Sequence, residues 1–233
     1  MRLLKVPGVY GPGSDSRLLA RAITEHVRPG DRVLDVFTGS GVLAVTAALA
    51  GAAEVWAVDV SRRAVLGTAL NARLNGVDVR IERGRIFEPI GNRRFDLIVA
   101  NPPYVPSVDK GEEVRGRARA WEAGEDGRRF LDPFLEQLPM HLSPLGRALL
   151  VQSSLCDVDR TLASLAANGL DAAVAASEEL PLGPITAPRA LALEQRGLLA
   201  RGQRTEETTV IAAFTPEPVA ITAEPAMVAL SPG

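Results

Sequence analysis

The sequence has few of the residues that carry nucleophilic or metal chemistry. Its 233 residues include one cysteine, Cys156, and two histidines, His26 and His141. One cysteine excludes an internal disulfide, which fits a reducing, cytoplasmic location, and no Cys/His cluster has the spacing of a metal site. Because no histidine and asparagine pattern accompanies Cys156, we expect a buried, inert thiol there.

The chain also lacks long apolar runs and a basic character. No apolar stretch approaches the roughly 20 residues of a membrane span, and the first residues break at Pro7 and Gly8, too early for a signal peptide. We therefore expect no membrane partner. The net charge is −2, whereas proteins that capture nucleic acid by broad electrostatics are usually basic. Arginines gather at 115–129 and 189–204, where either a phosphate contact or a solvated surface is compatible with the pattern.

What the chain does have is a regular alternation of strand and helix patterns. A helix over 16–27, capped by Ser14 or Asp15, comes first. Strands are expected at 33–37, 54–60, 77–83, 95–100, 147–153, 171–177 and 208–214, and helices at 41–50, 61–74, 126–142 (broken near Pro139) and 157–168. The alternation predicts one α/β domain over 1–214, with a parallel sheet and helices on both faces. Residues 215–233, with four prolines, are expected to form a disordered tail.

The tetrapeptide Asn101-Pro102-Pro103-Tyr104 directly follows the apolar strand pattern of 95–100. Two prolines fix φ and remove two backbone donors, and the residue before a proline is held extended. The result is a stiff loop that presents an amide, free carbonyls and an aromatic ring at the end of a strand. Such groups suit a flat target that bears an NH2 group.

A glycine-rich turn over 35–41, with Gly39 and Gly41, links the first strand to the next helix. Glycines allow close approach of backbone N–H groups to a ligand, and Asp59 at the end of the second strand can accept the hydroxyls of a ribose. The spacing indicates a nucleoside-containing cofactor and loosely fits a dinucleotide site as well. Asp35 would repel a pyrophosphate but suits a cationic sulfonium, which favours S-adenosylmethionine over NAD.

These features resemble the class I S-adenosylmethionine-dependent methyltransferases that modify planar NH2 groups, and within them the release-factor glutamine methyltransferase family. The segments that carry the resemblance are 9–16, 35–41, 101–105 and 121–127, together with Asp59. The resemblance covers about 6–214 and implies a Rossmann-like, doubly wound, mostly parallel sheet of seven strands with an antiparallel last strand. We expect no helical N-terminal domain of the kind usual in bacterial members, because the chain resembles the short eukaryotic and archaeal form, which in eukaryotes uses a small zinc-containing activator.

Carried over by position, the resemblance implies the following site. Asn101 would bind the target amide beside the methyl donor, Pro102 would present its carbonyl to the second amide hydrogen, and Tyr104 would pack on the target plane. The implied cofactor-binding residues are Ser16, Asp35, Phe37, Gly39, Gly41, Asp59, Arg85, Ile86 and Asn101. The implied substrate-binding residues are Asn101, Pro103, Tyr104 and Trp121, the last in a lid or wall formed by 121–127.

The sequence departs from the family pattern at two positions. Family members often have glycine where this chain has Phe37. They commonly read Gly-Asp-Leu-Phe-Glu-Pro where this chain reads Gly-Arg-Ile-Phe-Glu-Pro over 84–89. The aspartate that is replaced by Arg85 would normally accept from the adenine amino group, so the backbone around Arg85 and Ile86 is expected to take its place.

The leading hypothesis is thus a methyltransferase for the glutamine side-chain nitrogen of a protein such as a peptide-chain release factor. The same grip serves an exocyclic amine of adenine or guanine in RNA or DNA, so the tetrapeptide leaves both open. Methylation of a small molecule, or a non-catalytic cofactor-binding subunit, are further alternatives. No general base is needed, because the proton leaves after methyl transfer.

Overall fold

The computed structural model describes residues 1–9, 11–107 and 121–216. Most of the expected disordered tail, and the arginines at 115, 117 and 119, lie outside the described residues. The strands are β1 (Arg32–Val36), β2 (Glu54–Asp59), β3 (Arg80–Arg83), β4 (Phe95–Ala100), β5 (Leu142–Ser153), β6 (Asp171–Pro181) and β7 (Thr205–Phe214). The helices are α1 (Ser14–His26), α2 (Val42–Leu49), α3 (Arg62–Leu74), α4 (Leu131–His141), α5 (Val158–Ala167) and α6 (Ala190–Gln195).

The strands form one seven-stranded sheet in the order β3-β2-β1-β4-β5-β7-β6. The neighbours from β3 to β5 run parallel, and β7 is antiparallel to both β5 and β6. This confirms the expected doubly wound, mostly parallel sheet with an antiparallel last strand. The strand order reverses between β1 and β4, and ligands of open α/β sheets bind at the carboxyl ends of the strands at such a point.

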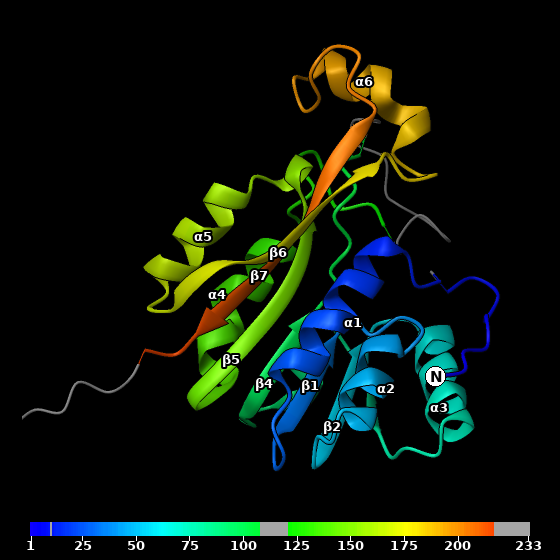
Figure 1. The fold of residues 1–233 in the computed structure, drawn as a ribbon, viewed down its shortest axis with the longest axis vertical. Helices are drawn as coiled ribbons and strands as arrows, with labels where there is room; N and C mark the ends of the chain where they lie inside the picture. Colours follow the sequence, from blue (N-terminus) through cyan, green and yellow to red (C-terminus); the bar gives the residue numbers. More distant parts are fainter. Residues whose placement is uncertain (10, 108–120, 217–233) are drawn as a thin grey trace, which may run out of the picture.

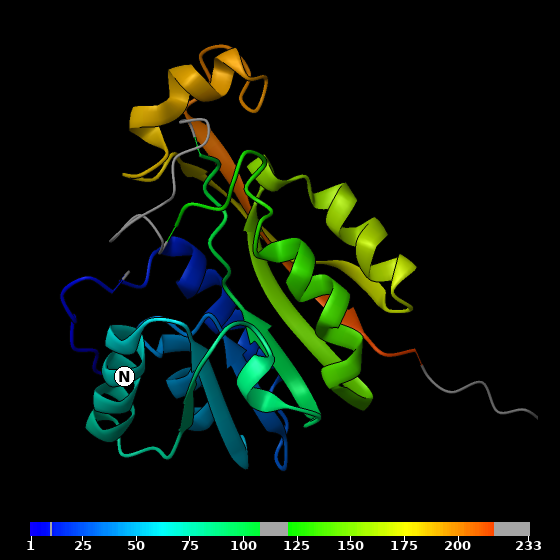
Figure 2. The ribbon, with the colours of Figure 1, turned by 180° about the vertical axis from the view of Figure 1, so that it is seen from behind.

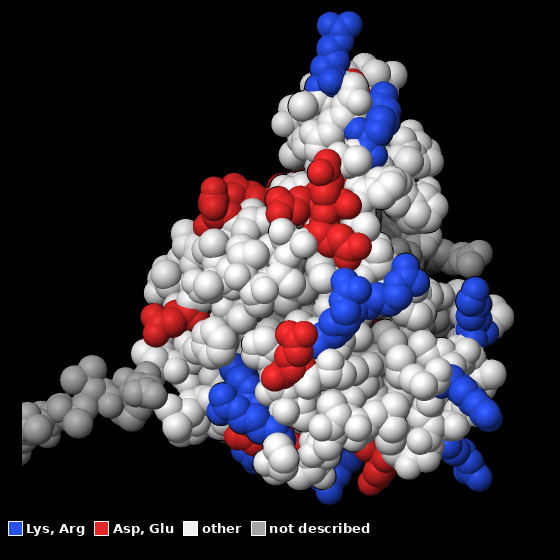
Figure 3. Space-filling model, viewed as in Figure 1, with Lys and Arg blue, Asp and Glu red and all other residues white. Residues whose placement is uncertain are grey.

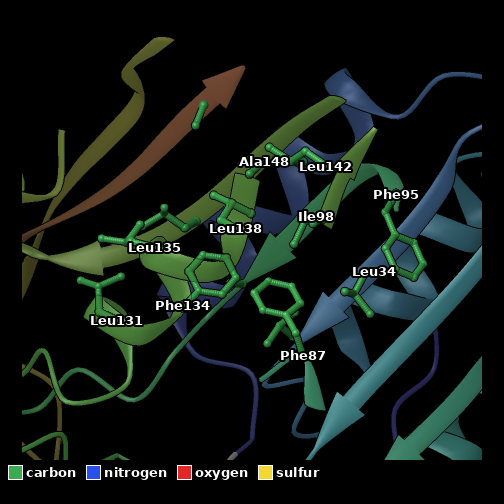
Figure 4. Packing of buried hydrophobic residues seen from close by; sticks show 14 of the residues in the cluster. Leu34, Phe87, Phe95, Ile98, Leu131, Phe134, Leu135, Leu138, Leu142 and Ala148 are labelled. Atoms are coloured by element: carbon green, nitrogen blue, oxygen red, sulfur yellow. The ribbon is translucent and has the colours of Figure 1, made fainter. Parts of the chain in front are cut away.

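Helices cover both faces of the sheet. Figure 1 shows α1, α2 and α3 in front of the sheet, and Figure 2 shows α4 and α5 on the opposite side. Strand alternation explains the two layers, because Val33 of β1 packs in the cluster with α1 and α2, whereas Leu34 and Val36 pack in the cluster with α4. In the cluster with α4, the rings of Phe87 and Phe134 stack with centroids 5.5 Å apart (Figure 4).

Apart from shifted strand ends, such as β5 beginning at Leu142 and not at 147, two helices differ from the sequence expectation. The helix expected over 126–142 begins only at Leu131 and continues through Pro139 to His141. Pro139 lies in the last turn, where it removes one hydrogen bond only, and the buried Leu138 and His141 hold the turn in the core. The second is α6, which lies in a segment between β6 and β7 with its own small apolar cluster that includes Leu182, Leu193 and Leu199. Figure 1 shows it above the ends of these strands.

The N-terminal segment runs along α3 and reaches the loop before α1. Asn75 and Asn71 hold it, because each side chain both accepts from and donates to the backbone of one residue of the segment, Arg2 and Leu4 respectively. Asn71 also donates to the Ser40 carbonyl at 2.8 Å. The segment is thereby tied to the glycine-rich turn. No helix in the described part of the chain is both long and apolar enough to cross a bilayer.

Candidate active site

A pocket of about 1170 Å³ lies at the carboxyl ends of β1, β2 and β4. Its volume exceeds the roughly 300–1,000 Å³ of a typical small-ligand pocket, so it has room for a cofactor and part of a second molecule. One part is lined by residues that follow β1, β2 and β3, including Phe37, Gly39, Asp59, Arg85 and Ile86. The part that we call the acceptor side is lined by Asp15, Asn101, Pro102, Pro103, Tyr104, Trp121, Glu122, Gly183, Ile185 and Glu206.

The side chain of Asn101 has a defined orientation at the end of β4. Its Nδ2 donates to Asp15 Oδ2 at 3.0 Å and to Ser16 Oγ at 3.2 Å. Tyr104 donates its hydroxyl hydrogen to the same Asp15 oxygen at 3.1 Å. No hydrogen bond among the described residues uses Asn101 Oδ1, so this oxygen remains to accept from a ligand in the pocket.

The loop that contains Asn101 is supported from behind by the segment 121–127. Val105 donates its backbone N–H to the Trp121 carbonyl at 2.8 Å, and Ala123 donates to the Val105 carbonyl at 2.9 Å, so that Val105 forms a bridge with Glu122. The Cys156 thiol lies 3.1 Å from the Tyr104 carbonyl oxygen. Cys156 is buried, as expected, and burial raises the pKa of its thiol to about 12.

Asp59 and the glycine-rich turn form the wall opposite Asn101. The Asp59 carboxylate accepts from the backbone N–H groups of Gly39 and Ser61 at 2.9 and 2.8 Å. Burial raises the pKa of Asp59, and these hydrogen bonds oppose the rise. The two bonds fix the carboxylate at the edge of the pocket, and each oxygen retains a lone pair for a ligand hydroxyl.

Comparison with known proteins finds methyltransferases among a family model and curated relatives. A family model described as ribosomal protein L11 methyltransferase (PrmA) matches residues 14–102. A putative protein N5-glutamine methyltransferase of Methanocaldococcus jannaschii is 33% identical over 175 residues, which are 75% of this chain and 87% of that protein. The chain belongs to the protein glutamine methyltransferase family. Its members are class I S-adenosylmethionine-dependent enzymes.

Other relatives match a smaller share of their own length. The release factor glutamine methyltransferase of Geobacter sulfurreducens is 32% identical over 170 residues, 70% of this chain and 59% of that protein. Among solved structures, the Mtq2–Trm112 complex of E. cuniculi, which methylates the termination factor eRF1, has a TM-score of 0.62 at 21% identity and covers 90% of this chain and 99% of the matched chain. At that identity the likeness shows the fold alone.

This glutamine methyltransferase has the groups that its cofactor, S-adenosylmethionine, requires. Asp59 has carboxylate oxygens for a ribose diol. Asp35, fully buried beneath the turn, has an Oδ1 with no hydrogen-bond partner among the described residues. On the pocket wall, Asp59 therefore fits the ribose of the cofactor.

The structure places most, but not all, of the predicted site residues on the pocket wall. Those that line it are Ser16, Phe37, Gly39, Asp59, Arg85, Ile86, Asn101, Pro102, Pro103, Tyr104 and Trp121. Asp35 lies behind the turn, where its Oδ2 accepts from Thr38 Oγ1 at 2.6 Å and from the Ala44 N–H at 3.0 Å. Gly41 also lies behind it, because a Cβ there would stand 2.7 Å from Thr68 Cγ2. Both residues shape the turn and are not pocket-wall residues.

One of the two departures from the family pattern, Phe37, has a local explanation. Phe37 adopts a left-handed φ of +63°, which costs a residue with a Cβ about 1–2 kcal/mol. Its ring packs against Phe130 and Phe134 at centroid distances of 6.4 and 6.2 Å, which offsets this cost. Arg85 donates its backbone N–H to the Glu88 carboxylate at 3.2 Å, and the role of the Arg85 backbone toward adenine stays a prediction.

Several arginines for which the sequence left open a phosphate contact bind within the protein instead. Arg128 is 1% exposed and donates to Asp132 Oδ1 at 2.9 Å and to Thr161 Oγ1 at 2.8 Å. It thereby fastens the end of the 121–127 segment to α5. Arg189 pairs with Glu122 at 3.0 Å, and Arg196 donates to the Glu125 carbonyl at 2.7 Å. These arginines hold the wall of the pocket together.

Sequence reasoning missed two acidic residues of the acceptor side. Asp15 looked like a helix cap, yet its carboxylate faces Asn101 and Tyr104, residues 86 and 89 positions away. Glu206 is buried at the start of β7, accepts from the Ser153 hydroxyl, and has a pKa raised by burial. In the described part of the chain no group of His, Cys, Asp or Glu side chains could hold a metal ion.

Asp35 predicts a pH dependence of stability. Burial raises the pKa of its carboxyl from 3.8 to about 7. Between these values the folded protein keeps a proton that the unfolded chain releases, so the free energy of unfolding falls as pH rises from about 4 to about 7. We expect Asp35→Asn, which keeps an acceptor oxygen for Ala44, to reduce this fall. Urea unfolding of both proteins at several pH values measures it, and parallel curves would contradict the prediction.

Proposed function

We propose that the protein transfers a methyl group from S-adenosylmethionine to the side-chain amide nitrogen of a glutamine in a peptide-chain release factor. The observation that carries the proposal is the orientation of Asn101. With Nδ2 held by Asp15 and Ser16, its Oδ1 is left to accept from an NH2 group inside a pocket that also contains the cofactor residues.

The chemistry depends on holding a weak nucleophile. S-adenosylmethionine supplies an electrophilic methyl group on a sulfonium. An amide lone pair is delocalised, so the protein has to fix both N–H bonds of the target and turn its nitrogen toward the methyl group. Asn101 Oδ1 and the Pro102 carbonyl are the two acceptors for those bonds, and both oppose the positive charge that develops on nitrogen. Such alignment contributes on the order of 7–11 kcal/mol in well-oriented reactions.

The acceptor side favours a protein over a nucleic acid. Its wall contains Asp15, Glu122 and Glu206, and Arg189 and Arg196 are engaged within the protein. In the view of Figure 3, acidic and basic groups are interspersed over the surface and no continuous basic face is visible. A polyanion gains affinity from free cations that face its phosphates, so this distribution suits a polypeptide. A translation factor as acceptor would place the enzyme in the cytoplasm.

A nucleobase amine is the second candidate, because the same two acceptors fit it. A solved T. thermophilus 16S rRNA methyltransferase in complex with AdoMet and guanosine shares the fold, with a TM-score of 0.57 at 22% identity over 90% of this chain. The Mtq2–Trm112 complex raises a related question, namely whether this chain works alone or with an activator subunit.

One competition assay tests the proposal. The purified protein is incubated with S-adenosylmethionine labelled in the methyl group, a purified peptide-chain release factor and total RNA. We expect label in the release factor, on glutamine, and no label in RNA, with weak dependence of the rate on salt. Label in RNA with the steep salt dependence of nucleic-acid binding would favour the second candidate. Transfer by the protein alone would show that no activator subunit is needed.

A further inference from the structure

Asp15 is the hydrogen-bonding centre of the acceptor side. It lies in the first turn of α1, is 4% exposed, and lines the pocket. Its Oδ2 accepts from Asn101 Nδ2 at 3.0 Å and from the Tyr104 hydroxyl at 3.1 Å, and its Oδ1 accepts from the Ser16 N–H at 2.6 Å. A negative side chain is also favoured in the first turn by the helix dipole.

The Asn101 amide has two ends, Oδ1 and Nδ2, which are similar in shape and opposite in hydrogen-bonding character. Only the arrangement with Nδ2 toward Asp15 leaves Oδ1 toward the pocket. A flipped amide would present two donors to the target NH2 group, and donors cannot hold donors. The orientation of Asn101 therefore decides whether its side chain can hold the NH2 group of a target amide.

We propose that Asp15 is a positioning residue that sets the orientation of the Asn101 amide and so makes Asn101 Oδ1 the acceptor for the target. This inference rests on the proposed function of Asn101. The three partners of the Asp15 side chain, namely the Ser16 N–H, Asn101 Nδ2 and the Tyr104 hydroxyl, all donate. Both terminal atoms of the side chain at position 15 therefore have to accept, which a carboxylate allows and an amide does not. By accepting from Nδ2 at the opposite end of the amide, Asp15 also polarises Oδ1, and hydrogen bonds in such a chain strengthen one another.

An isosteric substitution reverses the proposed orientation. In Asp15→Asn, the new amide can accept from Ser16 only by turning its NH2 toward Asn101. Asn101 then flips to accept with Oδ1, the Tyr104 hydroxyl rotates, and Nδ2 faces the pocket. The network stays satisfied while the wrong face is presented. We expect kcat for methyl transfer to fall about 100-fold, the loss that a small misplacement of reacting groups causes, with affinity for S-adenosylhomocysteine retained.

The exchanged pair provides the decisive test. In Asp15→Asn/Asn101→Asp, Asn at position 15 donates to one carboxylate oxygen at position 101, and the other oxygen again faces the target as an acceptor. We expect the double variant to transfer methyl groups at least about tenfold faster than either single variant, a coupling within the range seen for contacting residues. A double variant no better than the single ones would overturn the proposal.

Glu206→Gln is the matched control, because it neutralises another buried acidic side chain of the same wall without contacting Asn101. It is expected to cost less activity than Asp15→Asn. An equal loss would mean that charge and not orientation matters, which would overturn the proposal. A loss of S-adenosylhomocysteine affinity in Asp15→Asn that matches its loss of activity would also overturn it, because Asp15 would then be a cofactor ligand.

A readout without substrate separates this proposal from the proposed function. The Asn101 side-chain NH2 signal in an amide ¹H–¹⁵N spectrum is identified by its absence in Asn101→Asp. In the unsubstituted protein we expect slow exchange of this NH2 group with solvent, and faster exchange in Asp15→Asn. Exchange as fast as in an exposed asparagine in the unsubstituted protein would overturn the proposal. Absence of transfer to the release factor by the unsubstituted protein would instead overturn the proposed function.

Discussion

Asn101→Ala is expected to abolish methyl transfer while cofactor binding persists. The substitution removes Oδ1, one of two acceptors for the target N–H bonds, and leaves Asp59 and the glycine-rich turn on the opposite wall intact. Removal of one such pre-organised group costs about 100- to 1000-fold in kcat. The measurement is single-turnover transfer of labelled methyl groups to the acceptor, with S-adenosylhomocysteine affinity determined by calorimetry.

Asp59→Ala is the matched comparison, because it acts on the other molecule in the same pocket. It removes the carboxylate proposed for the ribose, so cofactor affinity should fall and methyl transfer should recover at high cofactor concentration. Asn101→Ala should thus lose methyl transfer and keep cofactor affinity, whereas Asp59→Ala should lose cofactor affinity and keep methyl transfer at high cofactor concentration. If Asn101→Ala weakened cofactor binding as much as Asp59→Ala, Asn101 would be a cofactor ligand and its assignment to the acceptor side would be wrong.

The fold, and the placement of Asn101 and Asp59 in one site, were predictable because the sequence patterns that indicate them are local. Alternating apolar patterns indicated every strand of the sheet, and the helix expected over 61–74 is α3, whose cap, Ser61, accepts from the Ala64 N–H. The segments around Asn101 and Asp59 follow strands β4 and β2 directly. Parallel strands bring their carboxyl ends to one edge of the sheet, so these two residues could be placed in one site from sequence alone.

Contacts between distant segments could not be predicted in this way. Asp15 reads as a cap in a local pattern, and its bonds to Asn101 and Tyr104 exist only after α1 packs against the sheet. The sequence also does not reveal on which side of a turn a carboxylate lies. Asp35 shares its strand face with Val33, under α1 and α2, and this alternation places it behind the turn. The segment that contains α6 has no long periodic pattern of apolar residues from which a helix could be predicted.

The segment 121–127 shows how a wall residue far from the chemistry can control the site. Gly127 has a φ of +74°, and a Cβ there would stand 2.5 Å from the Tyr104 carbonyl oxygen and 2.7 Å from Cys156 Sγ. Those atoms belong to the loop that presents Asn101 and to the residue that supports it. Close approach of the two backbones is therefore possible only with glycine.

Gly127→Ala is expected to displace the Asn101 loop and destabilise the protein. A left-handed residue with a Cβ costs about 1–2 kcal/mol, and an overpacked interior costs a further 1–3 kcal/mol or so. At about 2–4 °C for each kcal/mol in a domain of this size, the melting temperature should fall by several degrees. Methyl transfer should fall more than the lost stability explains, because the loop moves. The measurements are thermal unfolding and transfer at a temperature where both proteins are folded.

Gly124→Ala separates the backbone cost from the packing cost. Gly124 has a similar φ of +81°, but a Cβ there meets only Arg129 Cβ at 3.4 Å, an ordinary contact. The Gly124→Ala variant should therefore lose only the stability that a left-handed backbone costs a residue with a Cβ, about 1–2 kcal/mol, and should keep most of its activity. Since both glycines lie in the same segment, the difference between the variants measures the contact of Gly127 with Tyr104 and Cys156. Equal losses in the two variants would mean that this contact does not position the Asn101 loop.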